Sequence, residues 1–356
     1  MPSKVDVARW SRPFWWACQL MLAVMLVAAC AWSCSYAPAS LFRWINAFTA
    51  YFYLPAYAIL LVASLNRRQV LTAIAGLLVA WHMSVVLPSV ISPNWLSEPD
   101  RSPGAIEEAS IRVFYASVGK ANQKYEELFE EIRQSEADVL VLTEFTEAWY
   151  DKFNSTELPA DFPNHIHLSE YDAAATGVFS RLPLTEDDRV YQAKRVVVKA
   201  TVDVYGQELA ILAIHAPRPV RSPLHKYEEF WGILLEELEA ERANGHMLLI
   251  GDYNATPYSL IYRTLTTEYG LQDSHVTSGR GIATTWPNGT ELLPPIRIDH
   301  AMLTPGVTCL GIREGVGAGT DHKPLILDLA IPGERLRESG SPAPASTEQT
   351  LAATRY

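Results

Sequence analysis

Residues 251–257 read GDYNATP and place a carboxylate and a carboxamide two positions apart. They follow the apolar run 247–250, which is typical of a buried strand, so Asp252 and Asn254 stand where a strand ends. Because side chains alternate along a strand, the two share one face. The carboxylate could take a proton from water while the amide donates to an oxyanion. The other interpretation is a strand followed by an Asx-type turn, since Asp, Asn, Gly and Pro all favour turns.

More acids and imidazoles stand at the ends of expected strands. They are Glu144 after 139–142, His215 after 209–214, Asp299 within 298–303, and Asp321 and His322 just before 325–329. Each of these residues, taken alone, could have a purely structural role. Glu144, for example, could cap a helix. Taken together, they gather acids, imidazoles and an amide where strands meet loops, which is where active sites are built.

The elements that must position these residues predict an α/β domain over 111–331. Helices are expected at 124–135, 227–242 and 259–268, and strands at 111–116, 139–142, 177–179, 196–204, 209–214, 247–250, 298–303 and 325–329. Mixed strands and helices in this order imply sheets that helices bury on one face. Residues 93–110 are expected to be a linker. Residues 332–356, rich in Pro, Ser, Ala and charge, are expected to be a disordered tail.

Residues 1–92 are expected to form a membrane anchor of three transmembrane helices. The apolar stretches lie near 14–32, 47–65 and 70–91, and each approaches the roughly 20 residues that a spanning helix needs. Trp and Tyr cluster at their ends, as they do at membrane interfaces. Pro55 interrupts the second stretch and His82 lies in the third, and a small helical bundle tolerates both.

Basic residues predict the orientation of this anchor. All but one of them precede the first stretch or lie between the second and third: Lys4, Arg9, Arg12, Arg67 and Arg68. Only Arg43 lies in the other loop. The positive-inside rule then places the N-terminus in the cytoplasm. Three crossings of the inner or plasma membrane would leave the α/β domain outside the cytoplasm, in the periplasm.

In their order along the chain, these strand-end motifs resemble those of the endonuclease/exonuclease/phosphatase superfamily, also called DNase I-like. Further resemblance comes from 138–144 (DVLVLTE), 176–184 (TGVFSRLPL) and 285–287 (TWP), and together the motifs cover 111–331. The resemblance implies a four-layer sandwich of two mixed β-sheets flanked by helices. It also implies hydrolysis of phosphoesters with Mg²⁺ or Mn²⁺.

The resemblance implies a role for each residue that handles metal or water. Glu144 would be the principal metal ligand, and Asp321 would support the metal region. Asp252 would align and deprotonate the attacking water, while Asn254 would hold a phosphoryl oxygen. Hard divalent cations prefer carboxylate oxygens and keep several waters, which agrees with few protein ligands.

Other residues would contact the phosphate. The resemblance implies that His322, oriented by Asp299, and His215 do so. An Asp behind a His fixes its tautomer and favours its charged form beside an anionic substrate. Arg181 is a further candidate for binding substrate, or else an ordinary solvated side chain.

One position departs from the family pattern. The family usually has Asn at the end of the first strand, where this chain has Ser117. A Ser hydroxyl can donate one hydrogen bond but lacks the second group of an amide. With Ser117 at this position, metal binding or phosphate positioning is expected to be weaker, or the substrate to be a different one. Ser117→Asn should preserve or raise turnover, and a large loss would show that Ser is specifically required.

The distribution of charge along the chain bears on the class of substrate. Residues 1–100 hold six Lys/Arg and three Asp/Glu, which leaves 23 basic and 37 acidic residues in the remainder, a net charge of −14. A polyanion favours basic surfaces, so long nucleic acid is disfavoured. Bacterial membrane-anchored members of the family, one type of which is linked to glycopeptide-antibiotic resistance, suggest a phosphorylated lipid or pyrophosphate carrier. The alternatives are an extracytoplasmic nuclease acting on DNA or RNA, and an inactive membrane-tethered binding module.

Overall fold

The computed structural model describes most of the anchor and of the α/β domain. The described residues are 12–34, 40–91, 109–168, 175–192, 195–219, 222–242, 245–289 and 292–332. All but the last two residues of the expected linker 93–110 lie outside this set, as does the expected tail 332–356 apart from Pro332.

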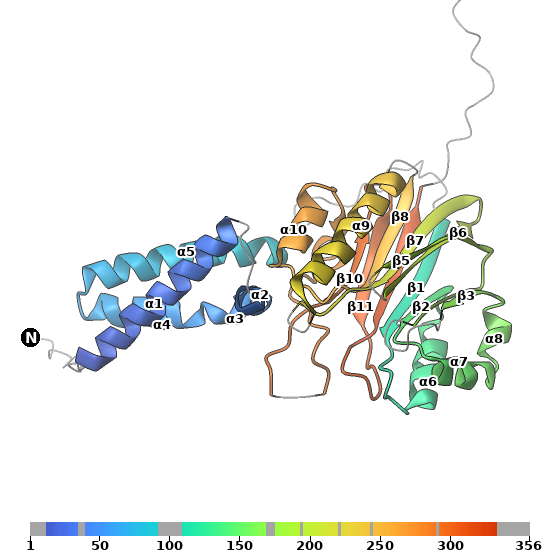
Figure 1. Ribbon diagram of the computed structural model, residues 1–356, viewed down its shortest axis with the longest axis horizontal. Helices are drawn as coiled ribbons and strands as arrows, with labels where there is room; N and C mark the ends of the chain where they lie inside the picture. Colours follow the sequence, from blue (N-terminus) through green and yellow to red (C-terminus); the bar gives the residue numbers. More distant parts are fainter. Residues whose placement is uncertain are drawn as a thin grey trace, which may run out of the picture.

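The anchor is a group of helices at one end of the molecule (Figure 1). Its helices are α1 (Arg12–Ser33), α2 (Ser40–Ala47), α3 (Thr49–Phe52), α4 (Leu54–Leu65) and α5 (Gln69–Val90). By length and composition, α1 and α5 are each able to cross a membrane. His82 of α5 is buried, but its two ring nitrogens lie 2.9 Å from the Tyr57 hydroxyl and 3.1 Å from the Thr49 carbonyl oxygen. The bundle therefore satisfies this polar group internally, as membrane interiors require.

The stretch expected as a span at 47–65 corresponds to helical residues 49–65. These residues meet the preceding helical residues 41–47 at 82°, and they form a third candidate span only if the bent pair is counted as one. Pro55 lies in the first turn of α4, where its missing N–H costs no helical bond. α2 carries Arg43 and Asn46 in an otherwise apolar sequence. It turns aside to lie against the α/β domain (Figure 1).

The α/β domain contains two six-stranded sheets. The first runs β11-β12-β1-β2-β4-β3 and the second β5-β6-β7-β8-β10-β9. The first-sheet strands are β1 (Ala109–Ser117), β2 (Val139–Thr143), β3 (Asn164–Leu168), β4 (Thr176–Ser180), β11 (Thr308–Glu314) and β12 (Leu325–Ile331). The second-sheet strands are β5 (Leu184–Gln192), β6 (Arg195–Val204), β7 (Gln207–His215), β8 (His246–Asp252), β9 (Gln272–Asp273) and β10 (Asp299–Leu303). Both are mixed, because β1–β2 and β7–β8 are parallel and the other pairs antiparallel.

Helices cover the outer face of each sheet. α6 (Tyr125–Ser135) and α7 (Glu147–Asn154), followed by the short α8 (Leu158–Asp161), pack on the first sheet. α9 (Leu224–Arg242) and α10 (Leu260–Thr267) pack on the second, and α11 (Ser274–Thr277) lies beside β10. Between the sheets lies a core of Val, Leu, Ile and Ala from both inner faces. The domain is thus the four-layer sandwich that the sequence predicts.

The central strand pairings bring strand ends together. Ser117 of β1 is level with Thr143 of β2 in the first sheet, and His215 of β7 is level with Asp252 of β8 in the second. Asp252 also pairs with Asp299, the first residue of β10. Because β1, β2, β7 and β8 all end at this edge, their terminal side chains meet between the two sheets.

The anchor contacts the domain through several polar bonds. The Trp32 indole donates to the Tyr258 carbonyl at 2.7 Å, and the Tyr51 hydroxyl donates to the Pro295 carbonyl at 2.6 Å. The guanidinium of Arg263 lies 4.0 Å from the centre of the Trp32 ring. The apolar helices are therefore packed on the domain at the side of α10.

Candidate active site

Most of the residues that the sequence singles out lie together at the ends of these strands. His215 and Asp252 end β7 and β8, Asp299 begins β10, Glu144 directly follows β2, and His322 lies in the turn before β12. All except Glu144 are buried. They form two connected groups, one around Asp299 and one around Asp252.

His322 and Asp299 form a buried ion pair. The His322 Nδ1 atom lies 2.8 Å from Asp299 Oδ2 and 3.1 Å from Oδ1. Burial by itself lowers the pKa of His322, but the charge and hydrogen bond of Asp299 outweigh it and raise the pKa to about 10. The ring is therefore an imidazolium at neutral pH, with Nδ1–H directed at Asp299 and Nε2–H available on the opposite side.

Tyr115 of β1 holds Asp299 from the other sheet. Its hydroxyl donates to Asp299 Oδ1 at 3.0 Å and lies 3.3 Å from the Thr143 hydroxyl oxygen. The backbone N–H of Asp299 donates to the Thr285 hydroxyl at 3.1 Å. The aspartate is thus fixed by groups from both sheets and from the loop before β10.

Asp252 is a buried carboxylate next to this ion pair. Burial raises the pKa of Asp252 to about 7, although the nearby charge of His322 opposes the shift. Its Oδ1 atom accepts from the backbone N–H of Asn254 at 2.7 Å. A carboxylate whose pKa lies near neutrality is suited to take a proton from water.

The Asn254 side chain is committed to holding Asp252. Its Nδ2 atom donates to Asp252 Oδ2 at 2.8 Å and to the Ala216 carbonyl at 3.0 Å, which uses both amide hydrogens. The reverse amide orientation would bring Oδ1 against two oxygens, so this assignment is the favourable one. Asn254 adopts the left-handed conformation, with φ +47°. In this arrangement Asn254 orients Asp252, and both of its amide hydrogens are used within the protein. The contact with a phosphoryl oxygen that the resemblance implies stays a prediction.

His215 lies between two carboxylates. Its Nε2 atom is 3.5 Å from Asp252 Oδ2 and 3.8 Å from Glu144 Oε1. Glu144 has φ +55°, and its other carboxylate oxygen accepts from the Lys120 backbone N–H at 3.0 Å. Arg218 approaches Glu144 Oε1 to 3.9 Å. Glu144 and Asp252 therefore face one space from opposite sheets.

The donor set fits a hard divalent cation. Ligand atoms of Asp252, Asp299 and His322 lie within 4.8 Å of one another. Asp299 and His322 are already bonded to each other, however, so these two are poor ligands in this state. Glu144 and Asp252 supply carboxylate oxygens, the type that Mg²⁺ or Mn²⁺ prefers.

Three predicted residues lie at or beyond the edge of the cluster. Ser117 is buried at the end of β1, and its carbonyl accepts from the Thr320 hydroxyl at 2.6 Å. Asp321 is exposed, and its carboxylate accepts from the Trp286 indole at 3.1 Å. Arg181 follows β4 at the end remote from Thr143.

Arg181 is placed for a structural role. Its Nε atom donates to the Ala137 carbonyl at 2.9 Å, and its guanidinium lies 4.8 Å from the centre of the Phe162 ring. The structure does not bring it to the other site residues, because β4 runs antiparallel to β2 and ends at the opposite sheet edge. This corrects the expectation that Arg181 binds substrate.

Sequence reasoning did not single out Tyr115 or Thr285. Tyr115 lies in an apolar strand and is typical of a core residue by its sequence context. The contact of its hydroxyl with Asp299 of the other sheet becomes evident only from the structure. Thr285 belongs to a motif that the resemblance used, but its bond to Asp299 depends on the fold.

Comparison with known proteins agrees with this geometry. A sequence profile of the Endonuclease/Exonuclease/phosphatase family matches residues 111–322. No curated protein is similar enough in sequence to count as a match.

Solved structures share the fold. D. rerio TDP2 in complex with a single-strand DNA product is 17% identical, with a TM-score of 0.51 over 62% of this chain and 99% of that one. A humanized D. rerio TDP2 carrying 14 mutations is 16% identical, with the same TM-score and coverage. An endonuclease/exonuclease/phosphatase from Bacteroides vulgatus is 16% identical, with a TM-score of 0.50 over 62% and 98%. At such identities the likeness shows the fold alone.

Proposed function

The chain belongs to the Endonuclease/Exonuclease/phosphatase family, and on that premise we propose that it is a membrane-anchored phosphoester hydrolase acting on a phosphorylated lipid or pyrophosphate carrier. The reaction we propose is attack of water on phosphorus with loss of the ester or anhydride leaving group. Mg²⁺ or Mn²⁺ at Glu144 would neutralise charge on the phosphoryl group when bound.

The protein's own residues would carry the proton and the charge. Asp252, buried and held by Asn254, takes a proton from the attacking water. The imidazolium of His322 donates from Nε2 to a phosphoryl oxygen while Asp299 holds Nδ1. His215, between Asp252 and Glu144, is within reach of the same phosphate. This follows the general pattern of positioning plus electrostatic stabilisation in phosphoryl transfer.

One observation carries the preference for a lipid. A cavity of about 300 Å³ reaches His322 and Asn254, and the anchor forms part of its wall. Asn254, Asp321 and His322 line one side, while Trp44 and Phe48 of the anchor line another. A substrate with an apolar part would meet apolar protein as its phosphate reaches the site. The net charge of −14 on residues 101–356 points away from long nucleic acid.

We further propose that the domain faces outside the cytoplasm. Arg12 begins α1, and Arg67 and Arg68 lie in the turn between α4 and α5. The positive-inside rule favours the cytoplasm for both places. Alkaline phosphatase fused after Ile331 should be active and a fluorescent protein fused there dark; the reverse pattern would overturn this orientation.

Two parallel assays test the function. Purified full-length protein in detergent is given farnesyl pyrophosphate, with phosphate release measured, and separately plasmid and single-stranded DNA, each with Mg²⁺ and with chelator. We expect phosphate release that requires Mg²⁺ and is lost in Asp252→Ala. DNA cleavage alone would favour the nuclease. Activity on neither, with folding intact, would favour a binding module, and unchanged activity in Asp252→Ala would refute the catalytic assignment.

A further inference from the structure

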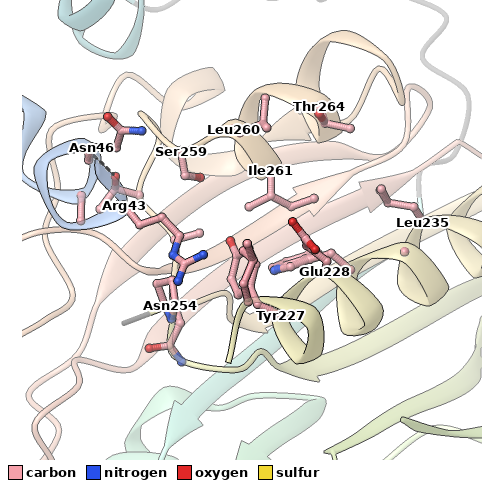
Figure 2. A pocket seen from close by; sticks show the side chains of 17 residues that line it. Arg43, Asn46, Tyr227, Glu228, Leu235, Asn254, Ser259, Leu260, Ile261 and Thr264 are labelled. Carbon is pink, nitrogen blue, oxygen red and sulfur yellow. Dashed lines mark hydrogen bonds between the residues drawn. The ribbon is translucent and has the colours of Figure 1, made fainter. Parts of the chain in front are cut away.

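The anchor places an arginine beside the catalytic residues. Arg43 of α2 borders the cavity that contains Asn254 and His322, and it also borders a neighbouring cavity of about 510 Å³. In Figure 2 its guanidinium lies between Asn254 and Tyr227. The guanidinium carbon is 5.8 Å from the centre of the Tyr227 ring.

Two of the three nitrogens of this half-buried guanidinium are shielded and unused. Its Nε and Nη1 atoms are shielded from solvent and have no hydrogen-bond partner among the residues that the structure describes. A buried cation is costly unless an anion and hydrogen-bond acceptors accompany it. α2 is itself held in place, since the Asn46 carbonyl accepts from the hydroxyls of Thr49 and Thr256 at 2.9 and 3.5 Å. The position is therefore suited to receive an anionic group.

The larger cavity leads away from Arg43 along apolar side chains. It lies between α2, α9 and α10 (Figure 2), and its lining includes Leu224, Trp231, Leu235, Leu260 and Ile261. Its volume falls within the range of roughly 300–1,000 Å³ that is usual for ligand sites. Because Asn254 and Arg43 line both cavities, an apolar chain attached to a phosphate at the site could continue into this space.

Resting on the proposed function, we propose that Arg43 is a substrate-binding residue supplied by the anchor. Its guanidinium binds the phosphate that carries the substrate's apolar chain, and that chain occupies the cavity between α2, α9 and α10. Arginine suits this task because its fork of donors matches phosphate oxygens. The anchor is then part of the active site as well as its tether.

Binding to a variant without turnover tests the role of Arg43. Full-length Asp252→Asn protein in detergent with Mg²⁺ is titrated calorimetrically with farnesyl pyrophosphate and with inorganic pyrophosphate. Arg43→Gln should weaken binding of farnesyl pyrophosphate roughly 10- to 100-fold, the value of a hydrogen bond to a charged group. Arg68→Gln is the matched control, because the Arg68 guanidinium also lies over an aromatic ring of the anchor, 5.0 Å from Trp15. It should leave both affinities unchanged.

A second variant tests the cavity. Gly232 of α9 lines it, and a Cβ there would meet no atom within 4 Å, so the Leu side chain of Gly232→Leu begins in open space at the cavity wall. Leu is also the better helix former, so folding should not suffer. We expect weaker binding of farnesyl pyrophosphate and unchanged binding of inorganic pyrophosphate.

The outcomes separate this inference from the proposed function. Wild-type affinity for farnesyl pyrophosphate in both Arg43→Gln and Gly232→Leu would overturn the inference, even if the wild-type enzyme hydrolyses that lipid. Conversely, the expected binding losses without any hydrolysis by the wild-type enzyme would support the binding site and refute the function.

Discussion

Gly251 is the position where one added methyl group should most directly disturb the active site. It precedes Asp252 in β8 and has φ +152°, a conformation that other residues rarely adopt. A Cβ at this position would lie 1.9 Å from the Ile214 carbonyl oxygen of β7. Gly251→Ala must therefore push β8 away from β7 at the point where His215 and Asp252 are level.

The expected cost has two parts. Holding Ala in this backbone conformation costs about 1–3 kcal/mol, and overpacking against a backbone atom adds about 1–3 kcal/mol. For a domain of this size, each kcal/mol lowers the melting temperature by roughly 2–4 °C. We expect a fall of roughly 5–20 °C. Because ~1 Å of misplacement can cost about 100-fold in rate, turnover should fall by about that factor in the protein that remains folded.

Gly245 provides the matched control. It stands just before β8, has φ +130°, and a Cβ there would meet no atom within 4 Å. Gly245→Ala should therefore show only the conformational cost, with near-normal turnover. The measurements are melting by circular dichroism and phosphate release from farnesyl pyrophosphate with Mg²⁺ by full-length protein. Equal melting temperatures and rates in the two variants would refute the argument from close strand approach.

Three further predictions follow from other contacts. Burial raises the pKa of Glu314, but hydrogen bonds from His275 and Arg280 outweigh it and lower the pKa from 4.5 to about 2. Because solvent screens this partly exposed group, the wild type should lose about 1–2 kcal/mol from it as pH falls through that window. Urea midpoints should fall correspondingly less in Glu314→Gln. Tyr115→Phe removes the 3.0 Å hydrogen bond to Asp299 and should lower the free energy of unfolding by about 1.5–3 kcal/mol. An unchanged melting temperature would contradict this stabilising role. Glu144→Gln should lower turnover at least ~100-fold and weaken Mg²⁺ binding in calorimetry; full activity would refute the ligand assignment.

The sequence predicts the domain well because its strands are short, apolar and bounded by polar residues. The run 247–250 anticipates the centre of β8, and polar residues after apolar runs mark the edge where Asp252, His215 and Glu144 meet. This part of the site can be predicted from the sequence because neighbouring parallel strands end at the same end of a sheet. The sequence pattern does not indicate β5, β9 or β11, since strands at the sheet margins require less apolar sequence.

Other features depend on the tertiary fold. Composition indicates the apolar stretch 47–65 but not the helix before it: α2 is turned by 82° from residues 49–65, and its Arg43 and Asn46 line a cavity with residues of the domain. Arg181 follows a motif strand, but the direction of β4 carries it to the far edge. Asn254 was expected to bind phosphate, and its hydrogens are used by Asp252 and Ala216. Residue type alone does not determine strand direction or which hydrogen bonds are already made.

The pairing of β1 with β12 has a consequence for biogenesis. The first strand of the domain pairs with its last, from Ala109 with Ile331 to Tyr115 with Leu325. His322 comes only just before that last strand. A nascent chain still being synthesised therefore has neither a closed first sheet nor His322. Any activity that depends on His322 can begin only after the chain has been made through β12 and the first sheet has closed.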